Sequence, residues 1–228
     1  MKLLFKNAYI VDAQSPYHLQ TVDVLVNGET IESIGEIAES ENISVIDLNG
    51  DTLTTGFAEL HSDLGELGND ESETLQTGAA AAAAGGFTAI GVVSNGSPYV
   101  DQKTGVEFLL SKGESVPVHI IPIGTLSKER KGEELSEMFE MSNYGTQVFA
   151  DYKQGVGNAN LLKLALLYTK PFGTIMVHPE DHSLSAGGMM HEGATSTYVG
   201  LKGIPEISET VQIHRDLSIL EYTEGNLH

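Results

Sequence analysis

The sequence predicts an α/β protein in which parallel strands alternate with helices, preceded by a small β module. From residue 56 onward, short continuous apolar runs alternate with helix-forming segments. Apolar runs of this kind are typical of parallel strands that are buried on both faces. Glycines stand at the returns from helix to strand, where helix ends favour them. Repeated units of this type form either an open doubly wound sheet or a (β/α)₈ barrel.

The first part of the chain, residues 1–54, is expected to form a small antiparallel sheet. Its strand formers fill residues 3–11, 22–26, 30–34 and 44–48. Asn27-Gly28 separates the second run from the third, and this dipeptide is a strong signal for a two-residue hairpin turn. No residue of this module indicates a chemical function.

The second part, residues 55–228, contains about five βα units, which are too few to close an eight-stranded barrel. The expected strands are residues 56–60, 87–93, 118–123, 146–150 and 174–177. The expected helices are residues 71–84, 103–112, 133–142, 160–169 and 206–222. Pro205 suits the first turn of the last helix, whose Ile207, Val211 and Leu217 should face the barrel. No Gly-x-Gly-x-x-Gly or Walker loop follows the first strand, which argues against a nucleotide site.

Composition narrows the classes of partner. The chain has 12 basic and 32 acidic residues and a net charge of −20, so nucleic acid and anionic membranes are not expected to bind it. It has no cysteine, so a metal would have to use histidine and carboxylate ligands. The apolar run at the N-terminus is too short for a signal peptide, and no run approaches the ~18 apolar residues of a membrane helix. We expect a soluble, cytoplasmic protein.

Residues able to hold a metal follow several of the expected strands. His61 and Asp63 end the first strand, and residues two apart in a strand point the same way, so the two side chains should project together. Asn95, Asp151 and His178 follow later strands, and in parallel α/β folds such strand ends meet at one face. Each residue alone is more often solvated or structural. Together, two histidines and two aspartates predict a site for zinc or a similar ion.

Several motifs resemble those of the dihydroorotases in the amidohydrolase superfamily. Residues 55–68, Thr-Gly-Phe-Ala-Glu-Leu-His-Ser-Asp-Leu-Gly-Glu-Leu-Gly, are similar to that family's Pro-Gly-Phe-x-Asp-x-His-x-His-x-Arg-Glu-x-Gly. Further similar segments follow in order at residues 95–98, 177–181, 190–193, 203–205 and 214–216. The resemblance covers nearly the whole chain. It implies a (β/α)₈ barrel of the amidohydrolase type with a small β-sandwich, of which residues 1–54 would be the part present here.

The resemblance also implies roles for individual residues. His61, Asp63, Asp151 and His178 correspond to metal positions, and Asn95 corresponds to a substrate-contacting asparagine. Asp63 stands where the family has a second histidine, so we expect zinc to bind weakly or not at all. The family's catalytic aspartate and its next ligand histidine would lie beyond residue 228, so we expect no catalytic residue in this chain.

Three departures from the family pattern bear on activity. Gly65 stands where the family has the arginine that binds the substrate carboxylate, and glycine offers no charge-assisted hydrogen bond. Tyr152 replaces the second aspartate of strand four, and Lys153 replaces the following glycine. Carbamylation of Lys153 would let it bridge two metals, as a lysine does in other branches of the superfamily.

Three functions are compatible with these residues. The first is a dihydroorotase-like amidohydrolase that opens a cyclic amide in pyrimidine biosynthesis, in a catalytically degenerate form. The second is a non-catalytic homologue that serves as a structural partner of aspartate transcarbamoylase. The third is an amidohydrolase whose substrate lacks a carboxylate. A homo-oligomer is expected, with a small cyclic amide or no small molecule as its ligand.

Overall fold

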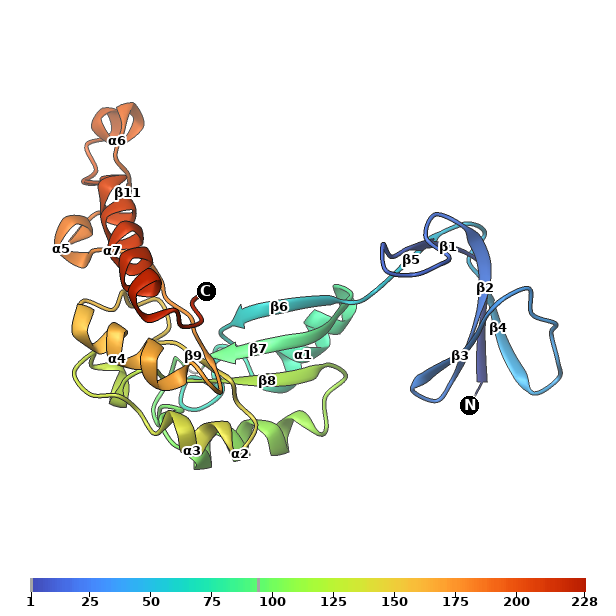
Figure 1. The fold of residues 1–228 in the computed structure, drawn as a ribbon. Coiled ribbons are helices and arrows are strands. Elements are labelled where there is room, and N and C mark those ends of the chain that lie inside the picture. Colours follow the sequence, from blue (N-terminus) through green and yellow to red (C-terminus); the bar gives the residue numbers. More distant parts are fainter. Residues whose placement is uncertain (1, 94) are drawn as a thin grey trace. The chain divides into compact units, whose positions relative to one another are not determined.

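The computed structural model describes residues 2–93 and 95–228. The chain forms two compact units, Met1–Gly56 and Phe57–His228. Figure 1 shows the first unit as a sheet and the second as alternating strands and helices. In the described ranges, no helix is both long and apolar enough to cross a membrane.

The first unit is a five-stranded sheet in the order β3-β2-β1-β4, with β5 also paired to β1. Its strands are β1 (Lys2–Val11), β2 (Thr21–Asn27), β3 (Thr30–Gly35), β4 (Ile43–Asp47) and β5 (Thr52–Thr54). The hairpin predicted at Asn27-Gly28 is confirmed, because Gly28 has a φ of 61° and Asn27 pairs with Thr30. The purely antiparallel prediction is wrong, since β4 and β5 pair with β1 in parallel. The chain crosses over between β3 and β4 and therefore returns in the direction of β1.

The second unit is built on a parallel sheet whose strands lie in sequence order, β10-β9-β8-β7-β6. The strands are β6 (Phe57–Ser62), β7 (Phe87–Val93), β8 (His119–Gly124), β9 (Val148–Phe149) and β10 (Thr174–Ile175). Leu227 forms an isolated parallel bridge with Ile175, so residues 226–228 lie along the free edge of β10. A doubly wound sheet reverses its strand order at a switch point, whereas a barrel keeps it. The sheet is therefore part of a (β/α)₈ barrel, as predicted.

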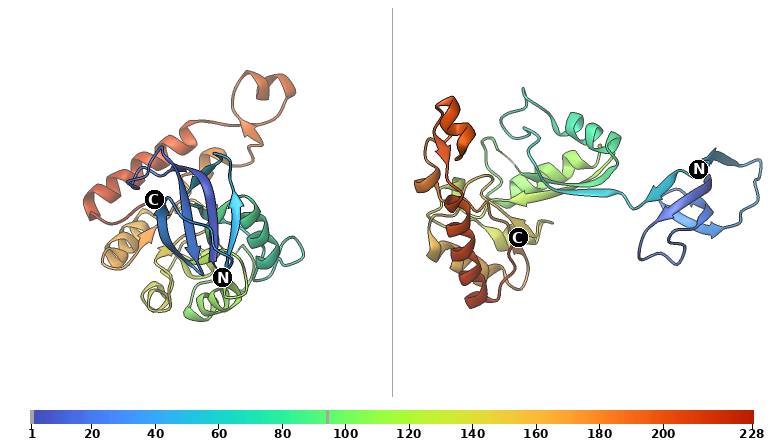
Figure 2. Two further views of the ribbon diagram at one scale, coloured as in Figure 1. Left: turned by 90° about the vertical axis from the view of Figure 1, so that its right-hand side faces the viewer. Right: turned by 90° about the horizontal axis from the view of Figure 1, so that it is seen from above.

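Four helices precede the C-terminal segment. They are α1 (Leu75–Ala84), α2 (Lys103–Gly113), α3 (Met138–Ser142) and α4 (Ala159–Thr169). Helices α1, α2 and α4 contact β7, β8 and β10, and the main core of this unit lies between helices and sheet (Figure 2). The helix expected over residues 133–142 is shorter, because the main chain of Glu134 and Ser136 is hydrogen-bonded to Lys128 and Leu126 instead.

The C-terminal segment contains α5 (His182–Ser185), β11 (Met190–His191), α6 (Ala194–Val199), β12 (Gly203–Ile204) and α7 (Ile207–Thr223). Pro205 precedes the N-cap residue Glu206 and so lies just outside α7. The prediction that the apolar residues of α7 face the barrel is wrong. Ile207, Val211 and Leu217 are 54%, 49% and 52% exposed, and the buried residues of the helix are Ser208, Gln212, Asp216 and Thr223.

Candidate functional site

The carboxyl ends of the parallel strands surround a pocket of about 240 Å³ in the second unit. Its lining residues are His61, Tyr152, Lys153, Met176, Val177, His178 and His228. The structure thus brings His61 and His178 to one pocket, as their positions after β6 and β10 predicted. Asp63, Asp151 and Asn95 are not among the residues that line it. His228, which follows the bridge between Leu227 and Ile175, is a lining residue that the sequence analysis did not single out.

Tyr152 is the residue around which this pocket is organised. Its phenol Oη donates a hydrogen bond to Asp63 Oδ2 at 2.8 Å, and its ring stacks on that of His61 with centroids 5.7 Å apart. Its φ of 56° lies in the left-handed region, which non-glycine residues rarely adopt. Burial, followed by the neighbouring Asp63, raises the pKa of the Tyr152 phenol. The phenol therefore keeps its proton at neutral pH and remains a donor.

Asp63 lies beside the pocket with its carboxylate already engaged. Oδ2 accepts from Tyr152, and Oδ1 accepts from the main-chain N–H of Gly65 at 3.3 Å. His61 and Asp63 both contact Tyr152, which agrees with the prediction that they project together. Their role as metal ligands stays a prediction.

Asp151 is 5% exposed and directs its carboxylate into the loop that follows β8. Oδ1 accepts from the main-chain N–H groups of Leu126 and Ser127 at 2.9 Å, and Oδ2 accepts from Ser127 Oγ. Burial raises the pKa of this carboxyl group, and the hydrogen bonds from Ser127 and Leu126 oppose that rise. These contacts give Asp151 a structural task in this chain, and its assignment as a metal ligand also stays a prediction.

His178 is paired with a carboxylate rather than grouped with other ligands. Its Nε2 lies 3.3 Å from Glu180 Oε2, and Glu180 has its pKa lowered first by a hydrogen bond from Ser185. Among the residues the structure describes, no three His, Asp or Glu side chains are grouped closely enough to hold a metal ion. Metal binding by His61, Asp63, Asp151 and His178 therefore stays a prediction.

Gly65 occupies a backbone conformation that a side chain cannot enter. Its φ is 70°, and a Cβ built there would lie 2.5 Å from the main-chain oxygen of Glu73 and 2.6 Å from that of Asn69. Real Cβ atoms do not approach backbone oxygens so closely, so an arginine at this position would require the 65–73 loop to move. The next residue, Glu66, is buried and accepts from the N–H of Leu75, which stabilises the start of α1.

Asn95, the predicted substrate contact, is exposed, and its main-chain oxygen accepts from Arg130 Nη2 at 3.2 Å. Sequence reasoning missed Arg130. The available signal was the place of Arg130 in the loop that follows the third strand of the sheet, β8. The structure places that exit beside Asn95 and Tyr152.

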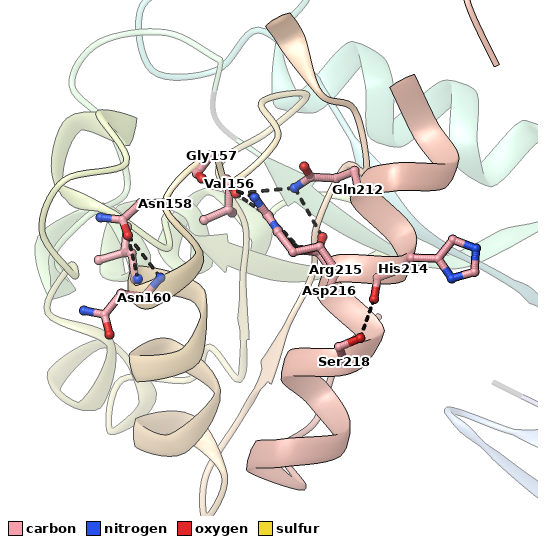
Figure 3. A network of polar contacts seen from close by, with 10 residues as sticks. Val156, Gly157, Asn158, Asn160, Gln212, His214, Arg215, Asp216 and Ser218 are labelled. Atoms are coloured by element: carbon pink, nitrogen blue, oxygen red, sulfur yellow. Dashed lines mark hydrogen bonds and ion pairs between the residues drawn. The ribbon is translucent and has the colours of Figure 1, made fainter. Parts of the chain in front are cut away.

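A buried polar network connects α7 to the loop that follows Tyr152 and Lys153 (Figure 3). Arg215 Nη1 donates to the main-chain oxygen of Gly157 at 3.2 Å, and Nη2 donates to that of Val156. Nε and Nη2 also donate to Asp216 Oδ1 at 2.9 and 2.7 Å. Asp216 is 2% exposed, whereas the Arg215 side chain is 27% exposed, so the ion pair is partly buried. The polar face of α7 thereby fixes the loop that carries two lining residues of the pocket.

Comparison with known proteins places these features in a family. The family model described as Dihydro-orotase-like matches residues 50–227. A dihydroorotase of Pelotomaculum thermopropionicum is 38% identical over 229 residues, and one of Ruminiclostridium cellulolyticum is 36% identical over 230. Each match covers 100% of this chain but only 53% and 54% of the relative. The chain therefore spans about half the length of these curated relatives.

Solved structures support the fold. A D-hydantoinase superposes with a TM-score of 0.73 at 20% identity, covering 100% of this chain and 51% of that one. An enamidase described as a member of the amidohydrolase superfamily superposes with a TM-score of 0.59 at 15% identity. This match covers 100% of this chain and 63% of the enamidase. At these identities the likeness concerns the fold alone, and it agrees with a partial amidohydrolase barrel.

Proposed function

The chain belongs to the dihydroorotase-like family, and from that membership we propose that it is a catalytically degenerate member that does not hydrolyse dihydroorotate. The observation that carries this proposal is the position of Tyr152. Its phenol is hydrogen-bonded to Asp63 and its ring lies on His61, so one neutral side chain engages both residues of the expected metal motif. The protonated phenol donates to Asp63 Oδ2 and so competes with a metal ion for that oxygen, while the ring of Tyr152 covers one face of His61.

The state of the other predicted ligands supports the same conclusion. Asp151 accepts three hydrogen bonds from the loop after β8, and both of its oxygens are used. Gly65 supplies no cation for a substrate carboxylate and has no room for one. Desolvating a carboxylate without a charge-assisted partner is unfavourable. We therefore expect this chain to bind a metal ion less well through Asp151, and a substrate carboxylate less well at position 65, than the family pattern implies.

The proposal is tested by assaying the purified full-length protein with added Zn²⁺. We expect substoichiometric zinc by mass spectrometry and no turnover of dihydroorotate above background in either direction of the reaction. Tyr152→Asp should raise zinc occupancy by freeing Asp63 and His61, but it should not produce efficient turnover because Gly65 is unchanged. Robust hydrolysis by the unmodified protein, or stoichiometric zinc that His178→Ala leaves in place, would contradict the proposal.

Two alternatives are separated by parallel measurements. Dihydrouracil, a cyclic amide without a carboxylate, tests for an amidohydrolase with a changed substrate. A structural role beside aspartate transcarbamoylase is favoured by the exposed apolar residues of α6 and α7, among them Tyr198 at 91% and Leu217 at 52%. Co-elution of the two purified proteins in size-exclusion chromatography, lost in Leu217→Glu, would support that role.

A further inference from the structure

The surroundings of Arg130 combine two aromatic rings with buried hydrogen-bond donors. Its guanidinium carbon lies 4.4 Å from the ring centroid of Tyr99 and 5.6 Å from that of Tyr152. Among the described residues, Nη2 alone has a hydrogen-bond acceptor, the main-chain oxygen of Asn95. Nε and Nη1 are buried and have no hydrogen-bond partner among the described residues. Buried donors without partners are rare in native proteins and point to a ligand or another specific role.

The charge of Arg130 is also uncompensated by a close carboxylate. No described Asp or Glu oxygen lies within 4.0 Å of its guanidinium, although the chain contains 32 acidic residues. Lys128 and Lys131 of the same loop, in contrast, are paired with Glu134 and Glu129. The charge of Arg130 lowers the pKa of the buried Asp151 carboxyl group, but Arg130 forms no ion pair as close as those of the two lysines among the described residues, so it can still receive an external anion.

The backbone that carries Arg130 is held in an unfavourable conformation. Glu129 and Arg130 have φ values of 48° and 55°, two consecutive L-residues in the left-handed region. Surrounding contacts enforce it: the N–H of Glu129 donates to Asp101, and the N–H of Gly132 donates to Ser127 Oγ at 2.9 Å. Strain that neighbouring contacts maintain is typical of ligand-binding positions.

We infer that Arg130 is an anion-binding residue of the barrel mouth, which takes a carboxylate or phosphate group of a small molecule. Its guanidinium, which lies against the rings of Tyr99 and Tyr152, offers charge-assisted hydrogen bonds to such a group. Arg130 as a whole is half-buried, so its side chain can turn to present the donors that the rings now cover. It supplies a second cation near the pocket that Lys153 lines, where Gly65 supplies none. The inference rests on the proposed function only in taking that mouth as a binding site.

Calorimetric titration of the purified full-length protein tests this inference. The probes are dihydroorotate, which carries a carboxylate, dihydrouracil, which has the same ring without one, and inorganic phosphate. We expect at least one anionic probe to bind and Arg130→Gln to weaken that binding about ten- to hundredfold, as loss of a charge-assisted hydrogen bond would. Lys131→Gln removes the same charge from the same loop and should bind within about twofold of the unmodified protein.

The probe that binds identifies the anion. Preference for dihydroorotate over phosphate indicates a carboxylate, and the reverse preference indicates a phosphate. Arg130→Lys keeps the charge without the planar donors, so its affinity for the anionic probe should lie between those of the unmodified protein and Arg130→Gln. If Arg130→Gln does not fold, the affinity of Arg130→Lys alone tests the inference. The inference is overturned if no anionic probe binds at millimolar concentration, or if the Arg130 variants bind like the unmodified protein. Turnover of dihydroorotate would refute the proposed degeneracy and leave the Arg130 comparison intact.

Discussion

A single side chain, Tyr152, defines the character of the pocket at the residue scale. Its phenol donates a hydrogen bond to Asp63, and its ring stacks on that of His61. The guanidinium of Arg130 lies 5.6 Å from the centroid of the same ring. Where the family resemblance implies an aspartate, this chain has a neutral donor with a raised pKa. The exchange replaces a group that attracts cations with one that occupies the space between two of the expected ligands.

The raised pKa of Tyr152 predicts a pH dependence of stability. The unfolded phenol titrates near pH 10, and the folded phenol titrates above that value. Its contribution is therefore complete below about pH 10 and is lost as the pH rises through the folded pKa. Tyr152→Phe should cost about 1 kcal/mol of unfolding free energy at pH 7. Urea unfolding of both proteins between pH 7 and 11 should show the difference shrinking only at the alkaline end; a difference that shrinks near pH 7 would refute it.

Gly65 allows a matched test of backbone constraint. Gly65→Ala places a Cβ 2.5 Å from a backbone oxygen in a left-handed conformation, so we expect a loss of more than about 2 kcal/mol in unfolding free energy. Gly132 has a φ of 69° with nothing within 4 Å, so Gly132→Ala should cost only the left-handed conformation, about 1–2 kcal/mol. Equal midpoints for the two variants in urea unfolding would show that the 65–73 loop yields freely.

At the scale of elements, α7 is held by its polar face. Arg215 bonds the main chain of Val156 and Gly157 and the carboxylate of Asp216, while the apolar residues on the opposite side are exposed. The apolar periodicity of the helix was visible in the sequence, and it predicted the wrong face. A buried ion pair together with backbone acceptors fixes the orientation that hydrophobic patterning alone did not indicate.

Removing Arg215 should separate α7 from the loop after β9. Arg215→Met keeps the apolar stem but leaves the buried Asp216 without its charged partner. We therefore expect the free energy of unfolding to fall by about 3 kcal/mol. Hydrogen exchange should quicken in residues 155–158 as well as in α7. His214→Ala is the matched control, because His214 is exposed and points away from the network (Figure 3). If His214→Ala were as destabilising as Arg215→Met, the Arg215 network would not be what holds α7 to the loop after β9.

At the scale of the whole molecule, the dominant property is a net charge of −20 on 228 residues. Repulsion among like charges destabilises a compact state, and salt screens it with a Debye length of about 10 Å at 0.1 M. The Tm should therefore rise by a few degrees between about 10 mM and 300 mM NaCl. KCl should give an equal rise if screening is the cause, whereas a rise with one salt alone would indicate specific ion binding.

The sequence by itself predicted the main strands and helices and their order, but not β5, α5, β11, α6 or β12. Apolar runs, glycines and Asn27-Gly28 act over a few neighbouring residues, so strands β6 to β10 and the β2–β3 hairpin were predicted within a few residues of their bounds. The strand exits also placed His61 and His178 at one pocket, because parallel strands in sequence order bring their carboxyl ends together.

Only the tertiary structure decided what the site residues do. Tyr152 bonds Asp63 across 89 residues of sequence, and Asp151 bonds the main chain of Leu126 across 25. Arg130 meets Tyr99 and Tyr152 because the exits of β7, β8 and β9 are adjacent in the sheet. A residue's type shows that it can bind a metal, an anion or a backbone amide, but its partner depends on which distant groups lie within hydrogen-bonding distance. The partner of each residue is therefore set by tertiary packing, which no local sequence pattern specifies.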